Sequence, residues 1–349
     1  MTKFLVEALV CKNSKRSKTH REDIAMRSFT RTIVVFVLCF VFNPLVIQAQ
    51  EKLKIAVIPK GDDSFFWQCV HKGAQSCGEV LGGVEVDWMP PKVAQDVKEQ
   101  IELVDQCTQQ GVRGIVLSPS DYALLAAPVA RAVKKGIPVL VIDSRLKGEP
   151  GKDYISYVST DNRNGGMLAG EAMAKMLGGK RKVLVLRYTV GQANLSERQD
   201  GFVKALEKYK DIHVVNKYRS DKPTVEDARV AGESMIDELR TVDGLFCPNE
   251  STTEGMLKAL QGAHLNGKIK FIGFDTSDLL VQALKHGDID ALVAQDPTRM
   301  GYFAVETLVD HIRGTKVPPV IDISVRVITR ENIGDPDIQK LIAMPSLIK

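Results

Sequence analysis

The chain has 349 residues, of which 44% are hydrophobic and 26% charged, an ordinary globular composition with room for two domains. Residues 1–49 hold eight of the 47 Lys and Arg residues and three of the 43 Asp and Glu residues, leaving 39 basic and 40 acidic residues in the rest. This balance in residues 50–349 does not suggest a surface that binds nucleic acid.

Residues 1–49 are predicted to be a signal peptide. Arg27 and Arg31 precede an apolar segment at residues 33–42, which is too short for a typical membrane-spanning helix and typical of a secretory signal. We expect cleavage after Ala49, and Met26 is an alternative start that gives a signal peptide of ordinary length. The pattern therefore predicts export to the periplasm, with an uncleaved N-terminal anchor as the alternative.

The first strand and the loop after it carry the strongest indication of a ligand site. Residues 54–58 are apolar and β-branched, as expected for a buried strand, and Ser64 is a plausible N-cap of the helix that opens at Phe65. Lys60 and Asp63 are expected beside Phe65 and Phe66 at the carboxyl end of this strand, where open α/β sheets bind ligands. Charges next to aromatic faces suit a polyhydroxylated ligand. The alternative is that these aromatic residues, with Trp67, only fill the core.

Strands and helices alternate along the remainder of the chain. Further strands are predicted at residues 84–88, 114–118, 137–143, 154–159, 182–188, 212–217, 244–248, 269–275, 291–295 and 320–327. Helices are predicted at residues 93–110, 123–135, 162–177, 196–209, 225–239, 252–264, 278–286, 300–313 and 336–342. This rhythm predicts parallel sheets covered by helices.

So many strands exceed one comfortable sheet, so we expect an α/β protein with two Rossmann-like, doubly wound lobes. The sequence contains no glycine-rich nucleotide fingerprint. Gly165-Gly166 at the start of a predicted helix is expected to allow close packing of that helix against a strand.

Four cysteines remain after the predicted cleavage: Cys69, Cys77, Cys107 and Cys247. The first two are about 12 Å apart along one predicted helix, too far to pair with each other. Disulfides are permitted in an exported chain, but all four lie in helix or strand patterns, so we expect buried free thiols. No metal-ligand spacing is present, and we expect neither a metal nor a cofactor.

Polar residues follow nearly every predicted strand. The candidates beyond the first loop are Asp143, Ser144, Asn249, Asp275 and Gln295, with Asn194 and Arg198 expected in the loop after the strand at 182–188. If two sheets face each other edge-on, these side chains converge on one cleft, where a ligand rich in hydroxyls would satisfy their hydrogen bonds. The alternative is helix capping, for example by Asp143 or Asp275.

Catalytic patterns are weak. None of the six histidines follows a strand among these polar residues, and there is no G-x-S-x-G motif. Carboxylates facing a sugar could hydrolyse a glycoside. The sequence nonetheless favours a binding protein over an enzyme.

An ordered set of motifs across residues 52–330 resembles the periplasmic binding proteins of the ribose-binding type, the sugar-binding components of ABC transporters. The motifs are Asp63-Ser64-Phe65-Phe66, Gly73-Ala74, Ile137-Pro138 leading to Asp143, Thr160-Asp161-Asn162 with Gly165-Gly166, Glu197-Arg198 before Gly201-Phe202, Asn249-Glu250, Gly273-Phe274-Asp275 and Gln295-Asp296-Pro297. No single motif decides the matter, but their order is specific.

The resemblance implies one sugar held between two lobes that are joined by a three-crossing hinge. It implies an N-terminal lobe of residues 52–159 plus 296–322 and a C-terminal lobe of residues 160–295 plus 323–349. The crossings are expected near 159–160, 295–296 and 321–327. Phe65 and Phe66 would sandwich the sugar, while Asp63, Asp143, Asn249, Asp275 and Gln295 would bind its hydroxyls.

This chain departs from the ribose-binding pattern at several positions. The ribose type has Asn where Asp63 stands, and it has Arg directly after the strand-end Asp, where this chain has Ser144. A ligand-binding Arg of the family falls at Ser196, so Arg198 matches only a neighbouring position. A family aromatic residue has no clear match near residues 220–221. These differences indicate a ligand other than ribose.

The loop around Lys60 is also similar to that of binding proteins for furanosyl quorum signals and rhamnose, in which the Lys contacts ligand. LacI-type repressors share the fold, but the secretory leader replaces their DNA-binding domain. The sequence therefore predicts a monomeric periplasmic protein that captures a sugar and delivers it to an ABC permease. A sensor that presents a sugar or furanosyl signal to a membrane receptor is the alternative.

Overall fold

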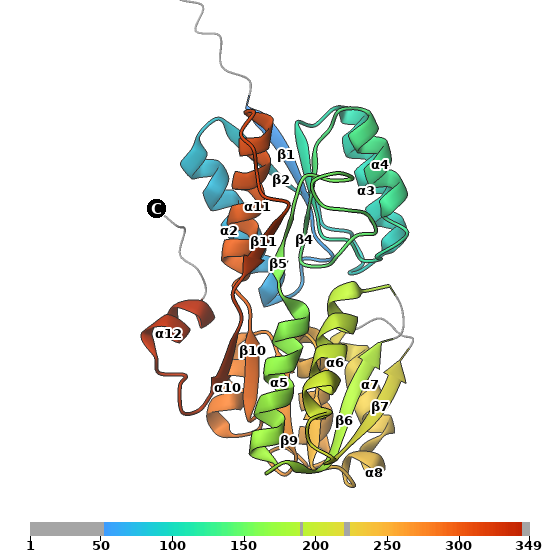
Figure 1. Cartoon of the computed structure of the whole chain (residues 1–349), viewed down its shortest axis with the longest axis vertical. Coiled ribbons are helices and arrows are strands. Elements are labelled where there is room, and N and C mark those ends of the chain that lie inside the picture. Colours follow the sequence, from blue (N-terminus) through green and yellow to red (C-terminus); the bar gives the residue numbers. More distant parts are fainter. Residues whose placement is uncertain (1–51, 189–190, 220–223, 344–349) are drawn as a thin grey trace, which may run out of the picture. The chain divides into compact units, whose positions relative to one another are not determined.

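A computed structural model describes residues 52–188, 191–219 and 224–343. The predicted signal peptide at residues 1–49 and the end of the tail at 344–349 lie outside the described residues. The structure contains two six-stranded sheets with strand orders β11-β5-β4-β3-β1-β2 and β12-β10-β9-β8-β6-β7 (Figure 1). We call each sheet with its covering helices a lobe, N-terminal for the first and C-terminal for the second.

The N-terminal lobe has two helices on each face of its sheet. Its strands are β1 (Leu53–Ile58), β2 (Val84–Trp88), β3 (Gly114–Leu117), β4 (Val139–Ile142), β5 (Tyr157–Thr160) and β11 (Val320–Ile323). One face packs against α2 (Phe65–Leu81) and α11 (Pro297–Ile312), and the other against α3 (Val97–Gln110) and α4 (Ala126–Lys134). Both faces of β1 are buried, because Ile55 and Val57 join one core while Ala56 and Ile58 join the other.

The C-terminal lobe has the same plan. Its strands are β6 (Lys180–Tyr188), β7 (Asp211–Arg219), β8 (Gly244–Phe246), β9 (Lys270–Phe274), β10 (Ala291–Ala294) and β12 (Arg326–Thr329). One face carries α5 (Asn162–Met176) and α6 (Ala193–Leu206). The other carries α7 (Val225–Ser234), α8 (Ile236–Leu239), α9 (Glu250–Gly262), α10 (Asp278–His286) and α12 (Pro336–Ile342). The antiparallel pair β10–β12 is the exception in otherwise parallel ladders. The expected α/β class with two doubly wound lobes is confirmed.

The chain passes between the two sheets at three places. It leaves the first sheet after β5, returns between β10 and α11, and leaves again between β11 and β12. The prediction of one strand at residues 320–327 is wrong, because this segment is two strands in different sheets. Both halves are β-branched, so the pattern gave no indication of the break at residues 324–325.

Most helices differ from their predicted bounds by a few residues, and three of the differences have a local cause or lack a signal in the sequence. The helix predicted at 225–239 is two helices, interrupted at Met235, where φ is −116°. Helix α3 begins four residues later than expected, because the side chain of Asp96 accepts the N–H of Glu99 at 3.0 Å and fixes the start. Helix α6 begins earlier, at Ala193, without a side-chain cap that sequence could reveal.

Close helix packing positions part of the cleft. A Cβ at Gly166 would lie 1.9 Å from the carbonyl oxygen of Arg198, so only glycine lets α5 approach α6 at this point. The expected close packing against a strand is confirmed at Gly165, which faces Phe274 at the end of β9, whereas Gly166 instead faces helix α6. Cys69, Cys77, Cys107 and Cys247 are buried free thiols, as expected.

Candidate functional site

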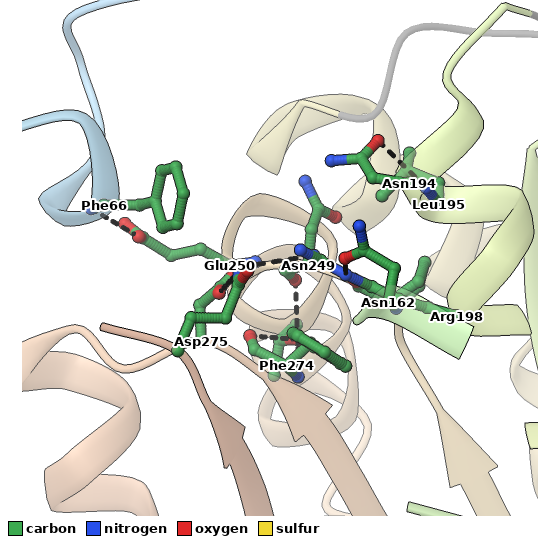
Figure 2. Close-up of polar contacts among 12 residues, drawn as sticks. Phe66, Asn162, Asn194, Leu195, Arg198, Asn249, Glu250, Phe274 and Asp275 are labelled. Carbon is green, nitrogen blue, oxygen red and sulfur yellow. Dashed lines mark hydrogen bonds and ion pairs between the residues drawn. The ribbon is translucent and has the colours of Figure 1, made fainter. Parts of the chain in front are cut away.

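A cavity of about 290 Å³ lies where the carboxyl ends of the two sheets face each other. It contains nine of the eleven predicted ligand residues: Lys60, Asp63, Phe66, Asp143, Asn194, Arg198, Asn249, Asp275 and Gln295. Figure 2 shows part of this group, with Phe66 contributed by one lobe and Arg198, Asn249 and Asp275 by the other. The structure thus brings most of the candidates together.

The loop after β1 forms one wall. Ser64 is the N-cap of α2, as predicted, and its Oγ accepts the N–H of Trp67 at 3.3 Å. Phe66 and Trp67 are both buried in the N-terminal core and also line the cavity. The core and ligand interpretations of these two residues are therefore compatible. Their rings offer an apolar face to whatever enters.

Lys60 and Asp143 form a buried ion pair in the N-terminal lobe. Lys60 Nζ lies 2.7 Å from Asp143 Oδ2, which also accepts the hydroxyl of Ser118 at 3.0 Å. Asp143 Oδ1 accepts Asn194 Nδ2 at 2.9 Å from the other lobe. Burial lowers the pKa of Lys60 in spite of this partner. Burial alone would raise the pKa of Asp143, but the charges of Lys60 and Arg198 hold it below its ordinary value.

A second polar group surrounds Asp275 in the C-terminal lobe. Its Oδ1 accepts Gln295 Nε2 at 2.6 Å, and its Oδ2 accepts the backbone N–H of Glu250 at 3.0 Å. Arg198 Nη1 lies 3.9 Å from Asp275 Oδ2. Burial raises the pKa of Asp275. Asp143 and Asp275 each follow a strand with a left-handed backbone, at φ values of 60° and 71°, which turns the chain at the sheet edge.

Arg198 is held rigidly. Its Nε donates to Asn162 Oδ1 at 2.8 Å and its Nη1 to the carbonyl of Pro248 at 2.9 Å. The guanidinium stacks 3.9 Å over the ring of Phe274. The expectation that Asn194 and Arg198 lie in a loop is wrong, because both lie on α6, four residues apart. Arg198 already falls within the helix predicted at 196–209, and Asn194 joins it because the helix begins at Ala193.

Two buried polar atoms of the described cavity have no hydrogen-bond partner in the protein. They are Nη2 of Arg198, a donor, and Oε1 of Gln295, an acceptor. Both side chains are almost fully buried and both line the cavity. Buried polar atoms are nearly always paired, so these two atoms are candidates for contact with a bound group.

The remaining candidates have other positions. Phe65 does not line the cavity and borders a small space beside it, together with Pro297. Ser144 does not line the cavity, and its Oγ accepts the N–H of Asn194 at 3.5 Å. Asn249 lines the cavity and also caps α9, since its Oδ1 accepts the N–H of Thr252 at 3.3 Å.

Neither strand-end aspartate caps the helix that follows it, although Asp275 accepts the first N–H of α9, that of Glu250. The carboxylate of Asp143 faces Lys60, Ser118 and Asn194 rather than a helix. Helix α10, which follows Asp275, is capped by Ser277. Both aspartates are therefore available as parts of the cavity.

Glu250 is the main residue that sequence reasoning missed. Its carboxylate accepts the N–H groups of Phe65 and Phe66 from the opposite lobe, each at 2.9 Å. Burial, together with the nearby charge of Asp275, raises the pKa of Glu250 to about 8. Its position directly after Asn249 at a strand end was an available indication. Gln95 and Gln192, which also line the cavity and bond to each other across the cleft, had no such signal.

Two α/β lobes with one polar cavity between their sheet edges are typical of a ligand-binding protein. The chain matches the family of periplasmic binding protein domains over residues 55–316. This chain belongs to the periplasmic binding protein family.

Similar proteins agree with this assignment. The ribose import binding protein of Haemophilus influenzae is 28% identical over 283 residues, covering 80% of this chain and 92% of that protein. A carbohydrate transporter solute-binding protein from Agrobacterium radiobacter, solved with D-arabinose, is 32% identical with a TM-score of 0.77, covering 84% and 99% of the two chains. An ABC transporter solute-binding protein from Agrobacterium vitis, solved with D-fucose, is 30% identical with a TM-score of 0.79, covering 83% and 100%.

The family is one of transport-associated binding proteins rather than of enzymes. Among the helices of residues 52–343 that the structure describes, none has the length and apolar character needed to cross a membrane.

Proposed function

We propose that this protein is a periplasmic solute-binding protein that captures one neutral monosaccharide between its lobes and delivers it to an ABC permease. The ligands named for its relatives and structural neighbours, ribose, arabinose and fucose, support the sugar class. The import function named for the ribose-binding relative supports the permease as a partner.

The pair of unpartnered atoms at Arg198 and Gln295 carries this proposal. Arg198 Nη2 needs an acceptor and Gln295 Oε1 needs a donor. A hydroxyl group supplies both functions, so a ligand with several hydroxyls satisfies the two atoms at once. The neighbouring ring of Phe66 would cover an apolar C–H face of the same ligand.

The size and charge of the cavity suit one neutral sugar. A volume of 290 Å³ lies at the small end of the range of small-molecule pockets, which is about 300–1,000 Å³. The ionisable side chains that line it are two bases, Lys60 and Arg198, and five acids: Asp63, Asp143, Glu226, Glu250 and Asp275. Because burial raises the pKa of Glu250 to about 8, this acid is mostly neutral at pH 7, and the other four still outnumber the two bases. This acidic excess disfavours sugar acids and sugar phosphates.

Binding would proceed by hinge closure. In the proposed division, residues 52–159 plus 296–322 move against residues 160–295 plus 323–349 about the three crossings between the sheets. In the closed form, contacts such as the hydrogen bond from the N–H of Tyr122 to the carbonyl of Gly191, at 2.8 Å, connect the lobes outside the cavity. Ligand and lobes together would then bury the polar atoms of both sheet edges.

Within the cavity, we assign direct hydroxyl contacts to Arg198, Asp275, Gln295 and Asn249. The Lys60–Asp143 pair is satisfied by the protein and also lines the cavity. The ammonium group of Lys60 donates to Asp143 and, at 3.4 Å, to Asn194 Oδ1, which leaves one of its three hydrogens for a ligand oxygen. In this assignment the residues around Asp275 bind the ligand hydroxyls directly, whereas the Lys60–Asp143 pair is held mainly by the protein.

A thermal-shift screen of the purified protein tests the proposal. The panel contains neutral pentoses, hexoses, deoxysugars and polyols, with sugar acids and sugar phosphates as controls. A ligand at 100 times its dissociation constant stabilises the folded protein by about 2.7 kcal/mol, which gives a clear shift. A shift with a neutral monosaccharide supports the proposal, and shifts restricted to anionic sugars, or none at all, would contradict it.

A further inference from the structure

Glu250 connects the two lobes through its side chain. It is the first residue of α9 in the C-terminal lobe, and it accepts the first two N–H groups of α2 in the N-terminal lobe. Figure 2 shows its carboxylate directed at the backbone of Phe66. The residue is 6% exposed, so these hydrogen bonds lie away from bulk solvent.

The first turn of α2 depends on this contact. The first N–H groups of a helix have no partner within the helix. Ser64 supplies a partner for Trp67 through its Oγ and for Gln68 through its carbonyl oxygen. For the N–H groups of Phe65 and Phe66, the partner is the carboxylate of Glu250.

The same residue is tied to the opposite half of the site. Its backbone N–H donates to Asp275 Oδ2 at 3.0 Å, and Asp275 in turn holds Gln295 at 2.6 Å. Glu250 therefore links the start of α2 in one lobe to Asp275 and Gln295 in the other. Its carboxylate oxygens are engaged by the backbone of α2, which leaves the ligand contacts to the residues on either side.

We propose that Glu250 is a positioning residue that locks the start of α2 onto the C-terminal lobe and thereby couples lobe closure to sugar affinity. The inference rests on the proposed function for its second half only, because the contact between Glu250 and α2 does not depend on which ligand the cavity binds. Helix N-termini attract negative charge, and Glu250 lies at the N-termini of both α2 and α9.

The charged surroundings of Glu250 are mixed. Asp275 and Glu254 are the acidic groups whose charges act on it, from the end of β9 and from α9 itself. The first turn of α2 contributes no acidic residue. Arg198 on α6 is the nearby basic group, at 3.9 Å from Asp275. The hydrogen bonds from α2 to Glu250 therefore form in spite of the repulsion between the buried carboxyl groups of Glu250 and Asp275.

The test compares Glu250→Ala and Glu250→Gln with Glu254→Ala and Glu254→Gln. Glu254 lies one turn further along α9, and it accepts the hydroxyl of Ser277 within its own lobe. Hydrogen exchange at the amides of Phe65 and Phe66 is measured in the purified protein with and without added sugar, and the dissociation constant is measured with the best neutral sugar of the screen.

We expect Glu250→Ala to expose the amides of Phe65 and Phe66 to exchange and to weaken sugar binding by about tenfold or more, mainly through faster dissociation. Above pH 8, where Glu250 is ionised, Glu250→Gln retains one of its two acceptors and should fall between Glu250→Ala and the wild type. Both Glu254 variants should keep wild-type exchange and affinity. Equal exchange protection in Glu250→Ala and the wild type, or unchanged sugar affinity, would overturn the inference.

The readouts separate the two proposals. If no sugar binds the wild type while Glu250→Ala loses amide protection, the proposed function fails and the lock remains. If sugar binds Glu250→Ala as tightly as the wild type, the coupling fails and the proposed function remains.

Discussion

Replacing Lys60 with Met removes the buried ammonium group from Asp143 while keeping an unbranched side chain of similar length. Both residues are at least 95% buried, with 2.7 Å between Nζ and Oδ2. Removing one member of a buried ion pair costs about 3–5 kcal/mol, because the other charge stays buried. Because Asp143 keeps its hydrogen bonds to Ser118 and Asn194, we expect the lower end of this range, a loss of about 3 kcal/mol in the free energy of unfolding.

The double variant Lys60→Met, Asp143→Asn provides the control, because Asn tolerates the left-handed backbone at this position. Because both charges are gone, it should be more stable than Lys60→Met alone by about 2 kcal/mol. Urea unfolding, followed by the fluorescence of Trp67 and Trp88, measures each free energy. A loss below about 1 kcal/mol in Lys60→Met, or a double variant as unstable as the single one, would refute the reasoning.

The pH dependence of Lys60→Met follows from the same pair. In the wild type, the pKa of Asp143 is held below its unfolded value, so its contribution to stability is present above that value and is lost as the pH falls. Without Lys60, burial raises the folded-state pKa instead, and stability is lost as the pH rises. Lys60→Met should therefore approach the wild type in stability between pH 7 and pH 5.

Three further predictions concern binding. Asp275→Asn should weaken sugar binding at least about tenfold while leaving the melting temperature of the free protein unchanged, because burial already raises the pKa of this carboxyl; a large drop in that temperature with normal affinity would indicate a purely structural role. Glu250 has a pKa of about 8 in the closed form, against an ordinary value of 4.5, so closure takes up a proton. Calorimetric affinity should accordingly rise as the pH falls from 9 to 6, by at most about tenfold per unit, and Glu250→Gln should flatten this slope. Phe66→Ala should weaken binding more than Phe65→Ala, since only Phe66 lines the cavity; an equal or larger effect at Phe65 would contradict the geometry.

The sequence predicted the fold because both faces of each sheet are covered, which makes the strands short, apolar and easy to distinguish from the helices. Residues 84–88 and 278–286 were predicted with the bounds that the structure shows. The segment at 320–327 was not, since a β-branched run carries no mark of the point where it changes sheet. The strands with which the two halves pair, β5 and β10, decide where this segment changes sheet, and they are distant from it in sequence.

The candidate site was predictable to the extent that polar residues follow parallel strands. Asp143, Asp275 and Gln295 follow this rule and line the cavity. The rule cannot tell which of two adjacent residues faces inward, and so Phe65 and Ser144 were included with Phe66 and Asp143. Contacts across the cleft, such as those of Glu250, depend on how the lobes meet, and a local pattern does not contain that information.

Calorimetric titration of the purified protein with the neutral monosaccharide that gives the largest thermal shift tests the central claim most directly, repeated on Gln295→Leu. We predict one binding site per chain in the wild type and a loss of affinity of at least about tenfold in Gln295→Leu, because the ligand hydroxyl that pairs with Oε1 loses its acceptor. Binding of the sugar with the same affinity in Gln295→Leu, or the absence of saturable binding in the wild type, would contradict the account of the cavity as the sugar site.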